Sequence, residues 1–230
     1  MKDAEFDKYA RDYQELLREP IRDRFARDPQ FYTERKWILL RQYLARAGRS
    51  PESMSWLDVG CGQGDLLRYG KSVFQRVAGC DTSEGMMERA AGLEVRHQSP
   101  PERLPFANGE FDIVTAVCVF HHVEPDQRFG LVMEMKRVLR PNGVVCIIEH
   151  NAQNPVVRSM VKRIPVDVHA ILLEQRECKE LFRQASLTAL PSEFFLYFPE
   201  PLFRAFGSLE ALGRHIPMGG QYAAFGLRPA

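Results

Sequence analysis

The stretch from Ser55 to Leu67 constrains the fold more strongly than any other part of the chain. It begins with a short apolar run, places glycines at alternate positions 60, 62 and 64, and returns to apolar residues. This pattern predicts a buried strand, a tight turn and the start of a helix. Glycine permits positive φ and close approach of the backbone, and a helix N-terminus presents free N–H groups. The stretch therefore predicts a site that holds a ligand against backbone.

The spacing of these glycines argues against a phosphate ligand. A dinucleotide fold requires Gly-x-Gly-x-x-Gly, but Asp65 stands where the last glycine of that motif would be. A carboxylate there would repel a pyrophosphate, and Asp58 adds a second acid that favours a cationic or amine-bearing ligand. At these residues the chain resembles the class I S-adenosylmethionine-dependent methyltransferases. Their first motif is an apolar strand ending in an acid, followed by Gly-x-Gly-x-Gly.

Length and composition are those of one large α/β domain. The chain has 230 residues, 45% of them hydrophobic and 27% charged, with a formal net charge of +1. That balance gives no electrostatic footprint for nucleic acid or an anionic membrane. No apolar run reaches the roughly 18 residues of a membrane span, and the N-terminus lacks the apolar core of a signal peptide. The five cysteines are dispersed without a Cys-x-x-Cys pair, which favours reduced thiols and a cytoplasmic location.

The hydrophobic pattern predicts a helical cap over residues 1–50 and a methyltransferase domain over residues 51–230, forming one globular unit. In the cap we expect a helix that Pro20 ends and a second helix over Phe31 to Ala47. The resemblance implies that such helices lie over cofactor and substrate, although a packed extension without ligand contact is an equal alternative. We expect strands at 55–59, 76–81, 93–97, 109–117, 144–148, 194–198 and 221–227, and helices at 66–74, 126–139 and 174–185.

These elements, with the resemblance over residues 54–149, predict the fold class. It is a doubly wound, mostly parallel seven-stranded α/β sheet with helices on both faces and an antiparallel last strand. The aromatic segment 199–216 is expected to wall a substrate pocket. Ligands bind beyond the carboxyl ends of strands in such sheets. The expected partners are a small-molecule acceptor and, at most, a second copy of the chain, with no nucleic acid and no membrane span.

Asp81 ends the second expected strand, about 20 residues after the glycine loop. Nucleotide-binding α/β folds place a ribose-binding carboxylate there, although Asp81 could instead serve as the N-cap of the next helix. Pro100 and Pro101 replace the family's adenine-binding Asp, so we expect Gln98, Ser99 or backbone to meet the adenine. The resemblance implies S-adenosyl-L-methionine as cofactor, contacted by Asp58, Gly60, Cys61, Gly62, Gly64, Asp81, Thr82, Met86, Gln98, Ser99, Val117 and Cys118.

Three histidines follow the fourth and fifth expected strands and are the candidate catalytic residues. A neutral imidazole can remove a proton from a hydroxyl or amine as the methyl group moves. We expect His122 and His150 to contact the acceptor ahead of His121, because adjacent residues usually point apart. Each could instead be a structural capping residue. Two histidines with Glu149 could suggest a metal site, but we expect none because a third well-placed ligand is missing.

The residues after the fourth expected strand bear on the acceptor. They read Cys118-Val119-Phe120-His121, not the Asn- or Asp-Pro-Pro-aromatic motif of methyltransferases that act on adenine or glutamine. This favours methyl transfer to a hydroxyl or similar nucleophile of a sugar, polyketide or lipid precursor. Two rival functions are a nucleotide-cofactor dehydrogenase, which the glycine spacing disfavours, and a non-catalytic binding subunit that retains the fold.

Overall fold

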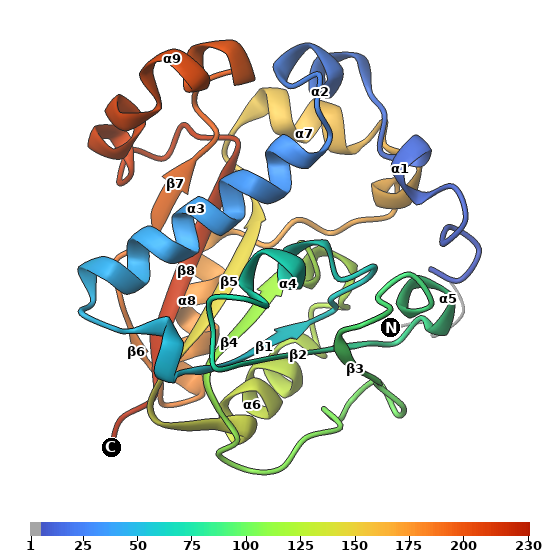
Figure 1. Ribbon diagram of the computed structural model, residues 1–230. Helices are drawn as coiled ribbons and strands as arrows, with labels where there is room; N and C mark the ends of the chain where they lie inside the picture. Colours follow the sequence, from blue (N-terminus) through green and yellow to red (C-terminus); the bar gives the residue numbers. More distant parts are fainter. Residues whose placement is uncertain (1–5) are drawn as a thin grey trace.

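The computed structural model describes residues 6–230, and a central sheet organises them (Figure 1). The strand order is β3-β2-β1-β4-β5-β8-β6, with β7 also paired to β8. Strands β1 to β5 run parallel, and β8 is antiparallel to β5, which confirms the predicted fold class. The strands are β1 (Ser55–Val59), β2 (Arg76–Asp81), β3 (Glu94–His97), β4 (Phe111–Val117), β5 (Leu139–His150), β6 (Thr188–Ala189), β7 (Glu193–Phe195) and β8 (Gln221–Leu227).

The sheet edge beyond β8 differs from the predicted single strand. Strand β6 pairs with the end of β8 and β7 pairs with its beginning, so two short pieces share one neighbour. Pro191 lies between them and cannot donate a ladder hydrogen bond. The expected strand at 194–198 is shorter, because Leu196 has a φ of 62° and the chain leaves the sheet there.

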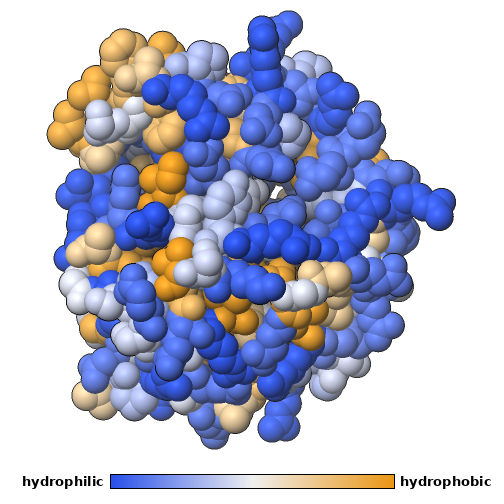
Figure 2. Space-filling model, viewed as in Figure 1, coloured by the Kyte–Doolittle hydropathy of each residue, from blue (hydrophilic) through white to orange (hydrophobic). Residues whose placement is uncertain are grey.

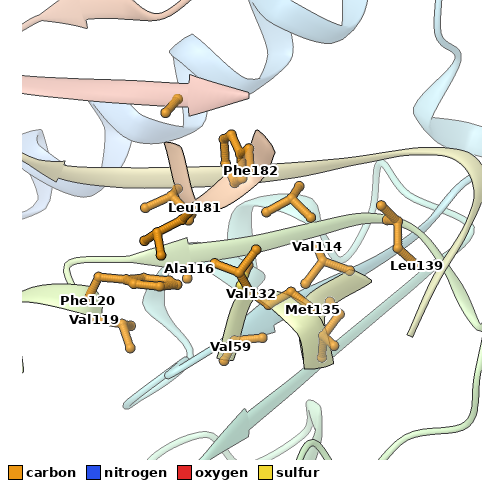
Figure 3. Packing of buried hydrophobic residues seen from close by; sticks show 14 of the residues in the cluster. Val59, Val114, Ala116, Val119, Phe120, Val132, Met135, Leu139, Leu181 and Phe182 are labelled. Atoms are coloured by element: carbon orange, nitrogen blue, oxygen red, sulfur yellow. The ribbon is translucent and has the colours of Figure 1, made fainter. Parts of the chain in front are cut away.

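Helices cover both faces of the sheet. In Figure 1, α3 (Gln30–Arg46) crosses one face, on which α4 (Asp65–Gly70) also lies. Trp37 of α3 packs there against Trp56 of β1. Figure 3 shows the opposite face, where Val132 and Met135 of α6 (Arg128–Val138) meet sheet residues such as Val114. Leu181 and Phe182 of α8 (Gln175–Gln184) complete this layer. Both faces are buried, as a parallel sheet requires.

The N-terminal region only partly follows the prediction. Pro20 was expected to end a helix but begins one, α2 (Pro20–Phe25), where proline at the first position suits the fixed φ of the first turn. The Glu19 side chain caps α2 by accepting from the N–H groups of Ile21 and Arg22, at 2.7 and 3.0 Å. Before it, only α1 (Tyr13–Leu16) is helical among the described residues. The division into two parts at residue 50 stays a prediction, and α3 packs directly on the sheet.

The remaining elements are short. They are α5 (Glu84–Met87), α7 (Pro155–Val161), α9 (Glu200–Glu210) and the 3₁₀ turns η1 (Pro51–Ser53), η2 (Phe120–His122), η3 (Pro165–Asp167) and η4 (Ala211–Gly213). Helix α7 begins after Asn154, whose side chain accepts from the backbone N–H groups of Val156 and Val157. Asp112, near the start of β4, has a structural role: it accepts from the Ser55 N–H at 2.8 Å and pairs with Arg140 at 2.6 Å.

The segment 199–216 forms α9 and η4. Its Phe203 packs edge-on against Phe31 and under the Arg35 guanidinium, so this segment stabilises α3. Figure 2 shows hydrophobic colouring over α9, where large apolar side chains such as Leu202 and Phe206 are exposed. Within the described chain, no helix is long and apolar enough to cross a membrane.

Candidate active site

The glycine loop lies between β1 and α4, as predicted. Gly60, Gly62 and Gly64 have φ values of 67°, 52° and 77°, a region that residues with a Cβ rarely adopt. A Cβ on Gly60 would lie 2.5 Å from Cγ2 of Val119, and one on Gly62 would lie 3.3 Å from Cε of Met86. The loop therefore needs glycine both for its conformation and for the space around it.

Asp81 holds this loop against the end of β2. Its carboxylate accepts hydrogen bonds from the Gly62 N–H at 2.8 Å and from the Ser83 N–H at 2.9 Å. Burial raises the pKa of Asp81. The alternative role as helix cap is wrong, because Asp81 still belongs to β2 and Ser83 caps α5 by accepting from the Met86 N–H at 3.1 Å. Asp81 thus connects the glycine loop to the residue that caps α5, and ribose binding by its carboxylate stays a prediction.

A cavity of about 680 Å³ lies over the glycine loop. Asp58 lines it, is almost fully buried and accepts from the Thr115 hydroxyl at 2.5 Å. Burial raises the pKa of Asp58 to about 7, although Thr115 and Lys36 oppose the shift. Of the residues predicted to bind cofactor, the cavity is lined by Asp58, Gly60, Cys61, Gly62, Met86 and Val117. We call it the cofactor cavity.

A second space of about 160 Å³ shares Gly60 as a lining residue with the cofactor cavity. Thr82 and Gln98 line it together with Val119, and the Gln98 amide donates to the Pro101 carbonyl at 2.5 Å. Ser99 does not accompany Gln98, because it lines a separate space beside Arg96. A ligand with an amino-acid end over the glycine loop and a nucleoside end beside Gln98 fits these two spaces. The residues present therefore suit S-adenosylmethionine.

A third cavity of about 290 Å³ adjoins the cofactor cavity, and we call it the acceptor cavity. Tyr13, Leu17, Arg22, Tyr32 and Lys36 line both, so the two spaces share one boundary. The acceptor cavity has mostly apolar walls from α2, α7 and neighbouring loops, formed by Ile21, Phe25, Val156, Val157, Met160, Ile164, Leu196 and Met218. The flanks of segment 199–216 contribute to this wall, whereas the segment itself does not line it.

Polar residues gather where β4 and β5 end and β8 begins, together with Asp167 of η3. The acceptor cavity is lined there by Cys118, His121, His122, His150, Asp167 and Gln221. Cys118 was predicted to contact the cofactor but lies on the acceptor side, where its backbone has a φ of 57°. Such conformations in residues other than glycine are uncommon and cluster at functional sites.

Two carboxylates hold His121 between them. Glu149 accepts from the Phe120 N–H at 2.7 Å and lies 2.5 Å from Nδ1 of His121. Oδ1 of Asp167 lies 3.4 Å from Nε2 of His121 and 3.2 Å from Nε2 of His122. The expectation that the adjacent histidines point apart is wrong. Residues 120–122 form a 3₁₀ turn, not a strand, and the two rings lie 4.2 Å apart.

These surroundings give the three histidines different charges. Burial lowers the pKa of His121, but the Glu149 and Asp167 carboxylates outweigh it and raise that pKa well above its ordinary value. Burial and the charge on His121 lower the pKa of His150 to about 4. Burial also lowers the pKa of His122, against the effect of Asp167. At neutral pH, His121 is therefore protonated while His122 and His150 are neutral.

Asp167 is a site residue that the sequence did not reveal. It lies on η3. Burial would raise the pKa of Asp167, but hydrogen bonds from His121 and His122 and the positive charge of His121 lower it. Ligand-type atoms of His121, His150 and Asp167 lie within 4.8 Å of one another, a spacing that could hold a metal ion. However, both ring nitrogens of His121 already face carboxylate oxygens. We therefore treat the group as a hydrogen-bonded network, and the absence of a metal stays a prediction.

Comparison with known proteins identifies a domain within the chain. A methyltransferase domain model matches residues 57–147, which span the glycine loop, Asp81 and the histidine pair. The chain carries a class I S-adenosylmethionine-dependent methyltransferase domain. S-adenosylmethionine is the cofactor of this family, which argues against the dehydrogenase alternative.

The relatives that match this domain are named for different acceptors. A probable tRNA methyltransferase 9B from Bos taurus is 30% identical over 139 residues, 58% of this chain and 29% of the relative. A demethylmenaquinone methyltransferase from Staphylococcus aureus is 38% identical over 120 residues, 47% of this chain and 48% of the relative. The chain thus spans less than half the length of either protein. Magnesium protoporphyrin IX methyltransferase from Synechocystis, crystallised with S-adenosylhomocysteine, shares the fold, with a TM-score of 0.66, 12% identity, and coverage of 97% and 95%.

Proposed function

We propose that this methyltransferase transfers the methyl group of S-adenosylmethionine to a hydroxyl or similar nucleophile of a small acceptor, such as a sugar, polyketide or lipid precursor. The observation that carries this proposal is the acceptor cavity, which adjoins the cofactor cavity and combines apolar walls with a histidine-lined end. A space of about 290 Å³ accommodates a small molecule or one end of a larger one. The apolar walls favour an acceptor with an apolar body.

The chain's own residues would mainly orient the reactants. Bound S-adenosylmethionine supplies an activated methyl group, so positioning accounts for most of the protein's contribution. We infer that His122 or His150 accepts the proton of the nucleophile, because both line the cavity and are neutral at neutral pH. His121 is unsuited to that role, since the Glu149 and Asp167 carboxylates keep it protonated. It instead fixes the arrangement of the network.

The tRNA methyltransferase relative suggests an alternative acceptor. Two observations favour a small molecule over RNA. The net charge of +1 gives little of the electrostatic attraction that RNA binding uses. The histidines also lie in a confined cavity of about 290 Å³, lined in part by the N-terminal helices.

A labelling experiment separates these functions. The protein would be incubated with methyl-labelled S-adenosylmethionine and, separately, a low-molecular-mass metabolite fraction or total tRNA. We expect label in the metabolite fraction alone. Label in tRNA alone would overturn the small-acceptor proposal. Binding of S-adenosylhomocysteine without label in either fraction would favour the non-catalytic subunit.

The histidines are tested with the labelled acceptor under single-turnover conditions. Loss of the general base in His122→Ala or His150→Ala should reduce the rate by about 10²–10⁴ and leave cofactor affinity unchanged. His215→Ala is the matched control, because His215 lines neither cavity and contacts the Ser192 carbonyl. Activity should rise with pH through the pKa of the base, near about 4 for His150 and below 6.5 for His122. Wild-type rates and pH dependence in both variants would show that the histidines are structural.

A further inference from the structure

Gln221 lines the acceptor cavity beside His150. It is the first residue of β8 and faces His150, the last residue of β5, across the antiparallel ladder. Directly opposed residues of an antiparallel pair carry their side chains on the same face of the sheet. Both residues line the acceptor cavity. A group bound beside His150 would therefore lie beside Gln221 as well.

One end of the Gln221 amide is anchored and the other end is not. Nε2 donates to Sγ of Cys118 at 3.3 Å. Oε1 is buried and has no hydrogen-bond partner among the described residues. Among the described residues, one other buried side-chain nitrogen or oxygen lacks a hydrogen-bond partner. It is Nε of Arg35, and the guanidinium to which it belongs is paired with Glu210. Gln221 is thus the residue of the acceptor cavity that keeps an unused hydrogen-bond acceptor.

An orphaned oxygen at this place needs a physical reason. A buried polar atom without a partner typically costs about 1–3 kcal/mol, and native proteins contain few of them. An apolar side chain of similar length could line the same space without that cost. The cost is offset when a ligand supplies the missing donor.

Building on the proposed function, we propose that Oε1 of Gln221 accepts a hydrogen bond from an O–H or N–H group of the acceptor. That group lies next to the part of the acceptor that is bound beside His150. The acceptor class is therefore an amphiphile whose polar end carries a hydrogen-bond donor and whose apolar body contacts the walls from α2 and α7. Analogues in which that donor is replaced by an ether or a hydrogen should be rejected, because they leave the buried oxygen unpaired.

The first arm of the test needs no acceptor. Gln221→Met removes the orphaned oxygen while keeping the side-chain length, so the ligand-free variant should unfold at the wild-type temperature or above it. Gln98→Met is the matched control. Gln98 is equally buried, but its amide donates to the Pro101 carbonyl at 2.5 Å and its oxygen lies 3.5 Å from Sγ of Cys80. The control should lower the unfolding temperature by roughly 2–8 °C.

The second arm uses the acceptor labelled by wild-type protein. Gln221→Met should reduce kcat/KM for that acceptor by about ten- to a hundredfold, and affinity for S-adenosylhomocysteine should stay within twofold. Unchanged kcat/KM in the folded variant would overturn the proposal. If the wild-type protein labels no acceptor, the proposed function fails. The unfolding temperatures of the first arm still decide whether Oε1 of Gln221 lacks a partner within the protein. A loss of stability in Gln221→Met equal to that of Gln98→Met would show that Oε1 has a partner within the protein.

Discussion

Asp81 offers the sharpest test of the cofactor site, because its carboxylate joins two segments. It accepts from the Gly62 N–H at 2.8 Å and from the Ser83 N–H at 2.9 Å. In Asp81→Asn, one of the two oxygens becomes an NH₂ group that faces a backbone donor. The variant therefore loses one hydrogen bond to a charged group and weakens any bond to the ribose hydroxyls.

The size of the effect follows from these contacts. A hydrogen bond to a charged group contributes about 1.5–3 kcal/mol. Loss of the backbone bond should lower the free energy of unfolding by about that amount in the absence of ligand. Loss of a ribose contact of the same kind should weaken S-adenosylhomocysteine binding by roughly ten- to a hundredfold, since about 1.4 kcal/mol corresponds to a factor of ten.

Calorimetric titration with S-adenosylhomocysteine and denaturant unfolding measure the two effects separately. Asp112→Asn is the control, because Asp112 also accepts from a backbone N–H, that of Ser55 at 2.8 Å, but lies near the start of β4 and makes no contact with the glycine loop. The control should lose stability and keep its affinity for S-adenosylhomocysteine. An Asp81→Asn protein that loses stability yet binds within twofold of wild type would refute ribose binding and leave Asp81 as a clamp on the loop.

Two further predictions concern the glycine loop and the acid beneath it. Gly62→Val should weaken S-adenosylhomocysteine binding by more than tenfold, because a branched side chain at a φ of 52° strains the loop beside Met86. Gly109→Val is the control: Gly109 has a φ of 63° and open space around it, so the variant carries similar backbone strain and should bind S-adenosylhomocysteine normally. Asp58 has a folded-state pKa raised by burial from 3.8 to about 7, so its contribution to stability is complete below about pH 3.8 and is lost as pH rises to about 7. A cationic cofactor favours the ionised form, so affinity measured by calorimetry should rise with pH up to about 7 in wild type, and equal pH dependence in Asp58→Asn would contradict this reasoning.

Much of the fold could be predicted because its signals are local. The run from Ser55 to Gly64 encodes a strand and a turn in consecutive residues, and β8 follows the predicted bounds of Gln221 and Leu227. Signals that depend on distant partners gave poorer predictions. Pro20 suits either end of a helix, and only the Glu19 side chain on the following N–H groups shows that α2 begins there. The edge of the sheet likewise depends on a distant partner, because β6 and β7 each pair with a different part of β8.

The sequence by itself determined the family, the cofactor loop and the histidines worth testing, because motif spacing reports the backbone conformation that a bound cofactor requires. Only the tertiary structure decided what those histidines do. Asp167 follows His150 by a loop and a helix, yet its carboxylate faces both His121 and His122. Gln221 belongs to a strand added at the far end of the chain, yet it lies opposite His150. Charge state and hydrogen-bond partners depend on such approaches between separate strands and turns, and no local pattern in the sequence records them.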